Sequence, residues 1–370
     1  MKIEKIALRE ISMPLKQPFE TSFGVTDRRR IVLVEFIADG ISGWGEVTAT
    51  EGPYYNSETT DTAWHVICDF LAPAIIGKRF DSVEALAAVM APVRGHEMAK
   101  GALEGAAWDA AARSGNIPLW SLLGGTLESL PSGVSMGIYK DTGVLLERIG
   151  AELAAGYRRV KLKIKPGHDV YVVEAVRKAY PDIALTVDAN SAYTLQDIST
   201  LRRLDEFALD YMEQPLGWNE IYQHAELQRQ LRTPICLDEC IHSLRDVEAA
   251  IAMRACGVIN IKLGRVSGHR EARKIQEYCL QKGVPAWCGG MLEAGIGRAH
   301  NIAMSSLPGF VMPGDVSASA RYWHQDIIEP EVTVTSQGTI SVPTGPGIGF
   351  AVNRELIDRL MVRSQEFRAS

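Results

Sequence analysis

Five charged residues recur along the chain at almost constant intervals, and each closes a short apolar run. Lys163, Asp188, Glu213, Asp238 and Lys262 stand 25, 25, 25 and 24 residues apart. Packing inside a barrel of parallel strands calls for Val, Ile and Leu, so packing does not explain these residue types. A repeated strand–helix unit of this length predicts that the five side chains meet at one mouth of a barrel, where barrel enzymes place their chemistry.

The three acids of this series have the character of metal ligands. Three monodentate carboxylates suit a hard octahedral cation such as Mg²⁺ or Mn²⁺, and leave about three of its six positions for substrate oxygens and water. Asn190 lies two residues beyond Asp188 on the same strand face, where it would hydrogen-bond a ligand carboxylate. Glu239 directly follows Asp238 and is expected to point the other way. Asp238 is the predicted ligand, with Asp188 and Glu213, because it keeps the 25-residue spacing.

The lysines of the series predict proton transfer. Lys161, Lys163 and Lys165 alternate along one strand, so their side chains face one side. Neighbouring ammonium groups disfavour each other's charge, which favours a general base. Lys262 ends a strand roughly across the barrel, and Arg265 is expected to disfavour its charge further. Lys165 is expected near or in the following loop.

Together these groups predict removal of the weakly acidic proton α to a carboxylate. The resulting enediolate carries negative charge on two oxygens, and a divalent cation would stabilise that charge where it develops. Two opposed lysines would permit removal of the proton on one face and its return on the other, which is racemisation. One base and one cationic stabiliser would permit elimination.

Short apolar strands alternate with amphipathic helices from about residue 130, which is typical of a parallel α/β sheet. The candidate strands are Gly133–Tyr139, Arg159–Ile164, Ile183–Asp188, Leu209–Glu213, Ile235–Asp238, Val258–Leu263, Val284–Gly289 and Phe310–Val316. Helices are predicted between them, among others at Thr142–Ala155, Leu195–Leu204, Ile221–Gln230, Leu244–Arg254 and Gly268–Gln281.

The two ends of the chain have a different pattern, and we expect them to form a capping domain. Residues 1–125 predict an α+β domain with strands Ile3–Leu15, Arg30–Ala38 and Gly43–Thr50, followed by helices Thr59–Leu71, Ser82–Met90 and Met98–Ser114. Residues 126–324 would form the barrel. The tail, residues 325–370, is expected to pack back on the N-terminal domain with strands Glu331–Val334 and Thr339–Val342 and a helix Arg354–Arg363.

Composition limits the class of partner. The 370-residue chain has 46 % hydrophobic residues, a net charge of −6 and a pI near 5.8, which argue against nucleic-acid and anionic-membrane partners. No 18-residue apolar run and no N-terminal signal pattern occur, and the six cysteines are scattered without a CxxC pair. We therefore expect a cytoplasmic enzyme, homo-oligomeric, acting on a small-molecule carboxylate.

These motifs resemble the enolase superfamily, in its muconate-cycloisomerase-like subgroup. The matching stretches are Val160-Lys161-Leu162-Lys163, Val187-Asp188-Ala189-Asn190, Met212-Glu213-Gln214-Pro215, Leu237-Asp238-Glu239, Ile261-Lys262 and residues 118–125. Within that subgroup the chain looks most like the o-succinylbenzoate synthase / N-succinylamino acid racemase family, on residues 287–300 and 313–319.

The resemblance implies an α/β fold, a modified TIM barrel of the (β/α)7β type with an α+β capping domain. It implies Mg²⁺ on the three acids and an acid/base pair of Lys163 and Lys262. It further implies racemisation of N-acylamino acids, the dehydration that forms o-succinylbenzoate in menaquinone synthesis, or both. Arg265 is similar to the racemase-competent members. By the same resemblance, substrate selection lies in loops of the capping domain, and the candidate pocket residues are Phe19, Phe23, Tyr55, Met291 and Ser317.

Other functions stay open at this stage. Dipeptide epimerases of the subgroup carry an Asp-x-Asp pair, where this chain has Asp315-Val316-Ser317. Muconate-type cycloisomerisation uses the same chemistry. Sugar-acid dehydratases usually have a histidine at the register of Lys262. A non-catalytic barrel that binds a metal or an acid is the alternative of a different class, although it has no need of opposed amines.

Overall fold

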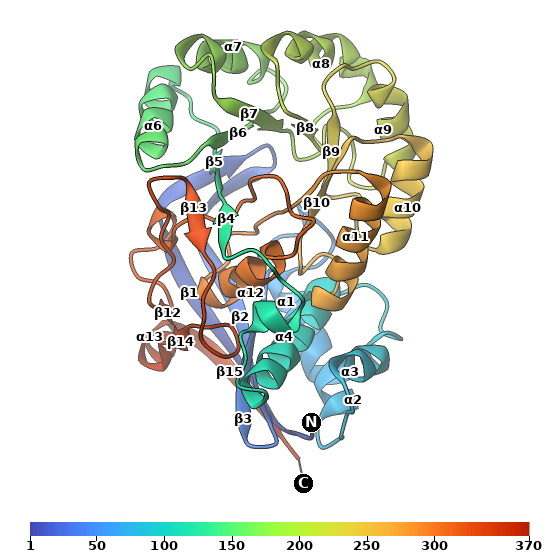
Figure 1. Ribbon diagram of the computed structural model, residues 1–370, viewed down its shortest axis with the longest axis vertical. Helices are drawn as coiled ribbons and strands as arrows, with labels where there is room; N and C mark the ends of the chain where they lie inside the picture. The colour runs from blue at the N-terminus through green and yellow to red at the C-terminus, as the bar shows by residue number, and fades with distance from the viewer. Residues whose placement is uncertain (370) are drawn as a thin grey trace.

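The computed structural model describes residues 1–369. Its centre is a curled parallel sheet with strand order β11-β10-β9-β8-β7-β6-β5, and the helices between the strands lie on its outside (Figure 1). The strands are β5 (Gly133–Met136), β6 (Arg159–Lys163), β7 (Ala184–Asp188), β8 (Met212–Glu213), β9 (Ile235–Leu237), β10 (Val258–Ile261) and β11 (Ala286–Cys288). The helices are α6 (Thr142–Ala154), α7 (Val170–Ala179), α8 (Ile198–Leu204), α9 (Ile221–Gln228), α10 (Leu244–Met253), α11 (His269–Lys282) and α12 (Gly295–Ser305).

The predicted eighth strand, Phe310–Val316, is not a regular strand. The segment instead makes single parallel bridges, from Phe310 to Ala286 on β11 and from Gly314 to Ser132 beside β5. Pro313 within it has no N–H to donate, which interrupts a ladder. The segment therefore closes the gap between the first and last strands of the sheet through isolated contacts.

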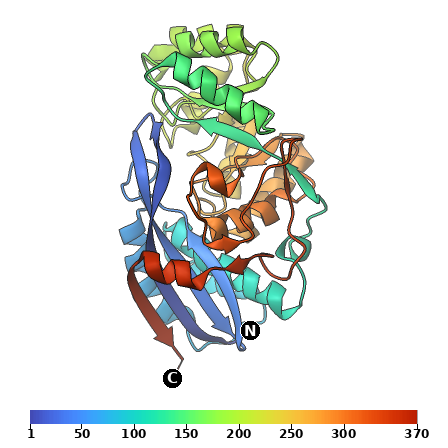
Figure 2. The same ribbon diagram turned by 90° about the vertical axis from the view of Figure 1, so that its left-hand side faces the viewer.

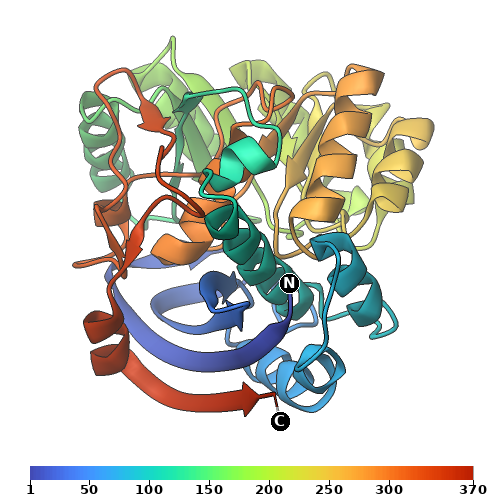
Figure 3. The same ribbon diagram turned by 60° about the horizontal axis from the view of Figure 1, so that its bottom comes forward.

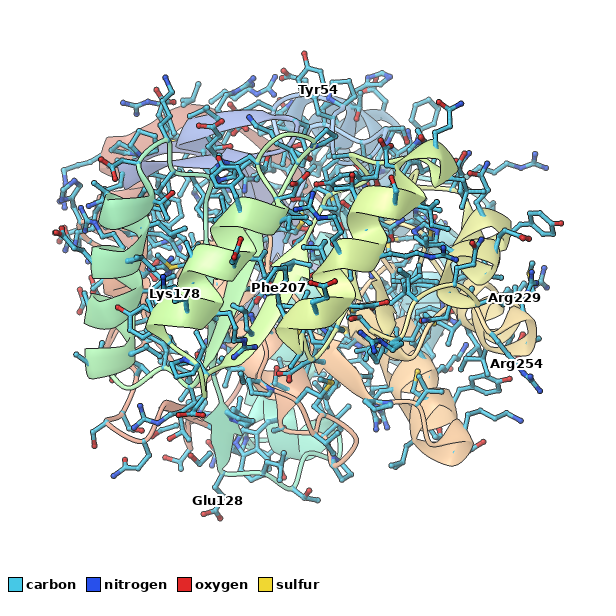
Figure 4. The ribbon with its side chains drawn as sticks, turned by 90° about the horizontal axis from the view of Figure 1, so that it is seen from above. Tyr54, Glu128, Lys178, Phe207, Arg229 and Arg254 are labelled. Carbon is cyan, nitrogen blue, oxygen red and sulfur yellow. The ribbon has the colours of Figure 1, made fainter. Side chains whose placement is uncertain are left out.

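The outer helices shield the sheet because each has one apolar stripe. In α7 the buried residues Val172, Val173 and Val176 face the sheet. Figure 4 shows Lys178, Arg229 and Arg254, which lie at the C-terminal ends of α7, α9 and α10, away from Tyr54 of the N-terminal region. The N-terminal region thus approaches the opposite end of the barrel.

Within residues 1–369, no helix combines the length and the apolar character that crossing a membrane requires.

The N-terminal region forms an antiparallel sheet of order β15-β1-β2-β3 with helices against it. Its elements are β1 (Ile3–Thr21), β2 (Gly24–Ala38), β3 (Ile41–Val47), α1 (Thr60–Val66), a π-helical turn (Ile67–Leu71), α2 (Ala72–Ile75), α3 (Val83–Met90), α4 (Glu97–Ser114) and α5 (Leu119–Leu122). Helix α4 lies between this sheet and the barrel (Figure 3). A Cβ at Gly45 would stand 2.0 Å from the carbonyl oxygen of Ala102, so glycine permits this close packing.

The C-terminal tail corrects two predictions. The predicted strand Glu331–Val334 is irregular, and the last helix, α13 (Arg354–Leu360), ends early. The following residues form β15 (Met361–Arg368), which pairs antiparallel with β1 from Lys5↔Arg368 onward. Figure 2 shows α13 and β15 beside the N-terminal strands.

Short pairs complete the tail: β12 (Ile328–Glu329) with β14 (Ala351–Val352), and β13 (Thr339–Ser341) with β4 (Ser129–Pro131). The division into residues 1–125, 126–324 and 325–370 stays a prediction. The β15–β1 ladder supports a capping domain built from both ends of the chain.

Candidate active site

The parallel register brings the charged residues of the 25-residue series to one level. Lys163 is paired with Asp188 across β6 and β7, and Asp188 with Glu213 across β7 and β8. Asp238 directly follows β9, and Lys262 directly follows β10. All five side chains therefore lie at the carboxyl ends of consecutive strands.

Each of the three acids presents one oxygen to a lysine and the other to a fixed donor. Lys163 Nζ lies 2.6 Å from Asp188 Oδ2, while the backbone N–H of Asn190 donates to Oδ1. Lys161 Nζ lies 2.8 Å from Glu213 Oε2, and Asn260 donates to Oε1 over 2.7 Å.

Asp238 has the same arrangement. Lys262 Nζ lies 2.8 Å from Asp238 Oδ2, and the Tyr55 hydroxyl donates to Oδ1 over 2.9 Å. Arg265 also donates to Asp238 Oδ1 and, over 2.9 Å, to Tyr55. The Tyr55 ring in addition packs against the lysine, whose Nζ lies 4.5 Å from the ring centroid.

Charge and burial act in opposite directions on these carboxyls. Burial and the neighbouring Asp188 hold the pKa of Glu213 above its usual range. Burial also disfavours the charge of Asp188, but Lys163 and Lys161 outweigh it and keep the pKa of Asp188 below its ordinary value. The lysines therefore keep part of the acidic cluster ionised.

The expectation that like charges lower the lysine pKa values is wrong for Lys161. Burial lowers its pKa, but Asp315, Glu213 and Asp188 outweigh burial and raise the pKa of Lys161 above its ordinary value. Lys161 is thus a permanent cation whose amine bonds Glu213 and, over 2.7 Å, Asp315 Oδ2.

The same correction applies to Lys262. Burial lowers its pKa, but Tyr55, Glu213 and Glu239 outweigh burial and raise the pKa of Lys262. Arg265 lies nearby, but its guanidinium is paired with the Asp238 carboxylate.

Glu239 does not point away from the site as strand alternation predicted. β9 ends at Leu237, so the next residues lie in a turn, where the Ile241 N–H bonds the Asp238 carbonyl. Asn190 Nδ2 donates to Glu239 Oε1 over 3.1 Å, while Glu239 Oε2 is buried without a partner. Burial and the charge of Asp188 raise the pKa of Glu239 to about 7.

A cavity opens above this cluster, between the barrel mouth and the N-terminal region. Lys163 and Lys262 both line it, as do four of the predicted pocket residues, Phe19, Phe23, Tyr55 and Met291. Ser317 does not line it: its side chain is buried and its neighbour Val316 faces the cavity instead.

The tip of the β1–β2 hairpin is attached to the barrel at three points. The Ile138 N–H donates to the Glu20 carbonyl over 2.9 Å, and Lys165 Nζ lies 3.0 Å from Glu20 Oε1. Ser22 donates to the Asn190 carbonyl over 3.2 Å. Lys165 therefore lies in the loop after β6, facing the hairpin.

Sequence reasoning missed several charged residues that meet here. Asp315 joins Lys161 to Arg159, whose Nη2 lies 2.9 Å from Asp315 Oδ1. Three further charged residues line the cavity: Arg29, Glu293 and Arg298. Asp315, Glu293 and Arg298 stand in stretches that the sequence singled out for the family resemblance, but none of these charged residues belongs to the 25-residue series, so no spacing signal marks them.

The donor set fits a divalent cation, although within residues 1–369 the His, Cys, Asp and Glu side chains form no group of three or more with metal-holding spacing. Lys161 lies between two of the acids, 2.8 Å from Glu213 and 3.5 Å from Asp188. Ammonium groups thus stand where a cation would meet carboxylate oxygens. The second oxygen of each acid is already held by a neighbour, as is common around metal sites. Glu239 Oε2 is buried beside these acids without a partner.

Comparison with known proteins identifies the family. Residues 3–124 match the N-terminal domain of the mandelate racemase / muconate lactonizing enzyme family, and residues 145–356 match the family described as enolase C-terminal domain-like. The chain belongs to the enolase superfamily. Enzymes of this superfamily typically use Mg²⁺.

Two relatives with enzyme names match this chain over almost its whole length. The chain is 49 % identical to an o-succinylbenzoate synthase of Geobacillus kaustophilus over 358 residues, 96 % of this chain and 95 % of the relative. It is 43 % identical to an N-succinylamino acid racemase of Thermus thermophilus over 370 residues, 100 % of both chains.

A solved structure agrees with the fold. A crystal structure of an enolase-superfamily member from Listeria innocua has a TM-score of 0.96 at 41 % identity and covers 100 % of both chains. The fold class expected from the sequence is therefore confirmed.

Proposed function

We propose that this enzyme removes the proton α to the carboxylate of an N-acylated amino acid and returns it on the opposite face, and that it also forms o-succinylbenzoate by dehydration. The observation that carries the proposal is the placement of Lys163 and Lys262 at the ends of β6 and just after β10, lining one cavity. Two amines that enter a cavity from different strands can reach opposite faces of a substrate held between them.

The two lysines would exchange roles with the hand of the substrate. One amine takes the α-proton, and the ammonium of the other returns a proton to the same carbon from the other side. In the dehydration, Lys163 would take the α-proton and protonate the leaving hydroxyl, while Lys262 steadies the enediolate as a cation. Asn190 orients Lys163, because its Oδ1 lies 2.6 Å from the amine.

Asp188, Glu213 and Asp238 would hold Mg²⁺ or Mn²⁺, and Glu239 and Asn190 support them. A divalent cation there would supply positive charge for the enediolate oxygens. Lys161 remains a fixed cation beside the acids. Asp315 holds it in place, and Arg159 in turn holds Asp315.

The acidic group that could bind the amino group of a dipeptide is already engaged. Asp315 accepts from Arg159 and Ser135 at Oδ1 and from Lys161 at Oδ2. Ser317 replaces the second acid of the epimerases and does not reach the cavity. This supports an acylated, uncharged nitrogen in the substrate rather than a free amine.

We also propose that the protein works in the cytoplasm as a homo-oligomer. Its six cysteines are free thiols, which supports a reducing compartment. Large apolar side chains are exposed at Phe70, Tyr171 and Leu280, which is compatible with contacts between copies. Multi-angle light scattering would measure the assembly state.

The direct test follows the α-proton of N-succinyl-L-phenylalanine by NMR in D₂O with Mg²⁺, alongside optical rotation. Loss of the α-proton signal with falling rotation is expected and requires both lysines. Exchange without loss of rotation would limit the reaction to one lysine. If neither this substrate nor the synthase substrate reacts although Mg²⁺ binds, the barrel would be a binding protein and the proposal would fail.

A further inference from the structure

Gln214 directly follows the acid Glu213 and takes no part in the chemistry above. Its side chain is completely buried, and its backbone has the left-handed value φ 36°. Non-glycine residues rarely adopt this conformation unless the surrounding contacts hold them there. The contacts of Gln214 therefore explain why its backbone is held in this conformation.

The Gln214 amide spans the ends of two neighbouring strands. Its Oε1 accepts from the backbone N–H of Asp238 over 3.0 Å and of Cys240 over 3.3 Å. Its Nε2 donates to the carbonyls of Leu216 and Gly217, each over 3.2 Å. Both amide donors and the acceptor are thus used, and they join the β8 loop to the β9 loop.

The backbone of Gln214 reaches the third strand end. Its carbonyl accepts from the Ser191 N–H over 2.8 Å. Ser191 lies in the loop that follows Asp188, the last residue of β7. Its own N–H donates to the Cys236 carbonyl over 2.9 Å. One residue therefore contacts the chain segments that carry all three acids.

Such a link is needed because the sheet is short at this point. β8 contains only Met212 and Glu213, and its ladder with β9 ends at the pair Glu213↔Cys236. Asp238 lies beyond the end of β9, where no ladder fixes its backbone. The Gln214 amide supplies hydrogen bonds at this point and links the segments that carry Glu213 and Asp238.

We propose that Gln214 is a positioning residue that presets the spacing of the three carboxylates for a divalent cation. This rests on the proposed metal site. Outer residues that orient metal ligands typically change metal affinity by about 10- to 100-fold when they are mutated. Loss of the Gln214 amide is expected to weaken Mg²⁺ and Mn²⁺ binding by that factor.

A matched control exists at the amino end of β9. Gln228 accepts from the Ile235 N–H over 2.7 Å and donates to the Thr233 carbonyl over 3.2 Å. It therefore joins a helix to the amino end of β9 as Gln214 joins a loop to its carboxyl end. Gln228→Met removes a comparable backbone link without approaching the acids.

The experiment compares wild type, Gln214→Met, Gln214→Asn and Gln228→Met. Titration calorimetry with MgCl₂ and the electron paramagnetic resonance signal of Mn²⁺ give the affinities, and thermal unfolding without metal gives the stabilities. Gln214→Asn guards against misfolding, because asparagine tolerates left-handed backbone while its shorter amide cannot span to Asp238.

The expected result is weaker metal binding in both Gln214 variants, seen in the resonance as a larger sharp signal from free Mn²⁺, with Gln228→Met losing stability but keeping the wild-type affinity. Wild-type affinity in a folded Gln214→Asn protein would overturn the inference, and so would equal weakening in Gln228→Met. Failure of the wild type itself to bind either cation would instead refute the proposed metal site.

Discussion

Acidic side chains are buried in two regions of this protein, the barrel mouth and the junction between the N-terminal region and the barrel helices, and they are neutralised differently. At the mouth, Asp188, Glu213 and Asp238 each meet a lysine amine at 2.6 to 2.8 Å. At the junction, Glu46 accepts from the backbone N–H groups of Ala294 and Gly297 at the start of α12.

Glu104 repeats the junction pattern at α11, where it accepts from the Arg270 N–H over 3.1 Å. Within residues 1–369 neither Glu46 nor Glu104 forms an ion pair, and both accept hydrogen bonds from backbone N–H groups at the start of a helix. Burial raises the pKa of Glu46 to about 8 and that of Glu104 to about 7. The mouth, by contrast, keeps Asp188 ionised.

The difference teaches that burial of an acid does not by itself mark an active site. Backbone N–H groups are fixed and hold a carboxylate for packing two segments together. Lysine amines bring a full positive charge on a long side chain, and a metal ion could take their place at the carboxylates. The counter-charge, rather than the acid, distinguishes the two regions.

The largest effect is expected from removing a lysine at the mouth. Lys163→Ala or Lys262→Ala removes one of the two proton-transfer groups, so kcat for racemisation should fall by about 10²- to 10⁴-fold. Steady-state polarimetry measures the loss. Glu46→Gln is the control from the junction, and it should retain wild-type kcat. Equal losses in both regions would erase the functional distinction between them.

At the junction the largest effect is expected on stability. Gly268 has φ 107°, and a Cβ there would stand 1.7 Å from Glu104 Oε2. Gly268→Ala should therefore lower the free energy of unfolding by about 3 kcal/mol. Gly283→Ala, at the other end of α11 with φ 66° and no atom near the new Cβ, tests a left-handed glycine without a clash and should lower it by about 1 kcal/mol. Urea unfolding of both variants measures the difference, and equal losses would show that Glu104 simply moves aside.

The raised pKa of Glu46 predicts a pH dependence. The folded protein retains a proton between the ordinary value of 4.5 and about 8 that the unfolded chain has lost, so stability should decrease as pH rises through this window. The contribution is at most about 1.4 kcal/mol per pH unit. Glu46→Gln cannot ionise and should flatten the decrease, becoming more stable than wild type above pH 8. Parallel stability curves for the two proteins would contradict the assignment.

The smallest effect is expected where a mouth lysine is exposed. Lys165 bonds Glu20 across the hairpin contact, but the two side chains are 36 % and 27 % exposed. Such pairs contribute roughly 0 to 1 kcal/mol, so Lys165→Ala should alter stability by about 0.5 kcal/mol and leave kcat near wild type. A loss of kcat as large as that of Lys163→Ala would give Lys165 a direct part in the reaction.

Much of the fold could be predicted from the sequence because it depends on local patterns. The strands β5 to β11 and their helices follow from apolar runs and amphipathic periods. β15 was missed because its exposed, charged residues resemble the end of a helix, and only pairing with β1 makes them a strand. The segment Phe310–Val316 was predicted as a regular strand but forms only isolated bridges. A single sequence does not show where the pairing between strands is interrupted.

The sequence by itself determined which residues reach the strand ends, because one polar residue at the end of each apolar run, repeated every 25 residues, has no packing explanation. The tertiary structure alone decided their counter-charges. Glu239 turns toward Asn190 because β9 ends before it, and Lys161 stays charged because Asp315, far away in sequence, lies against it. Electrostatic interactions depend on distance in space and on burial, and neither quantity is contained in residue spacing.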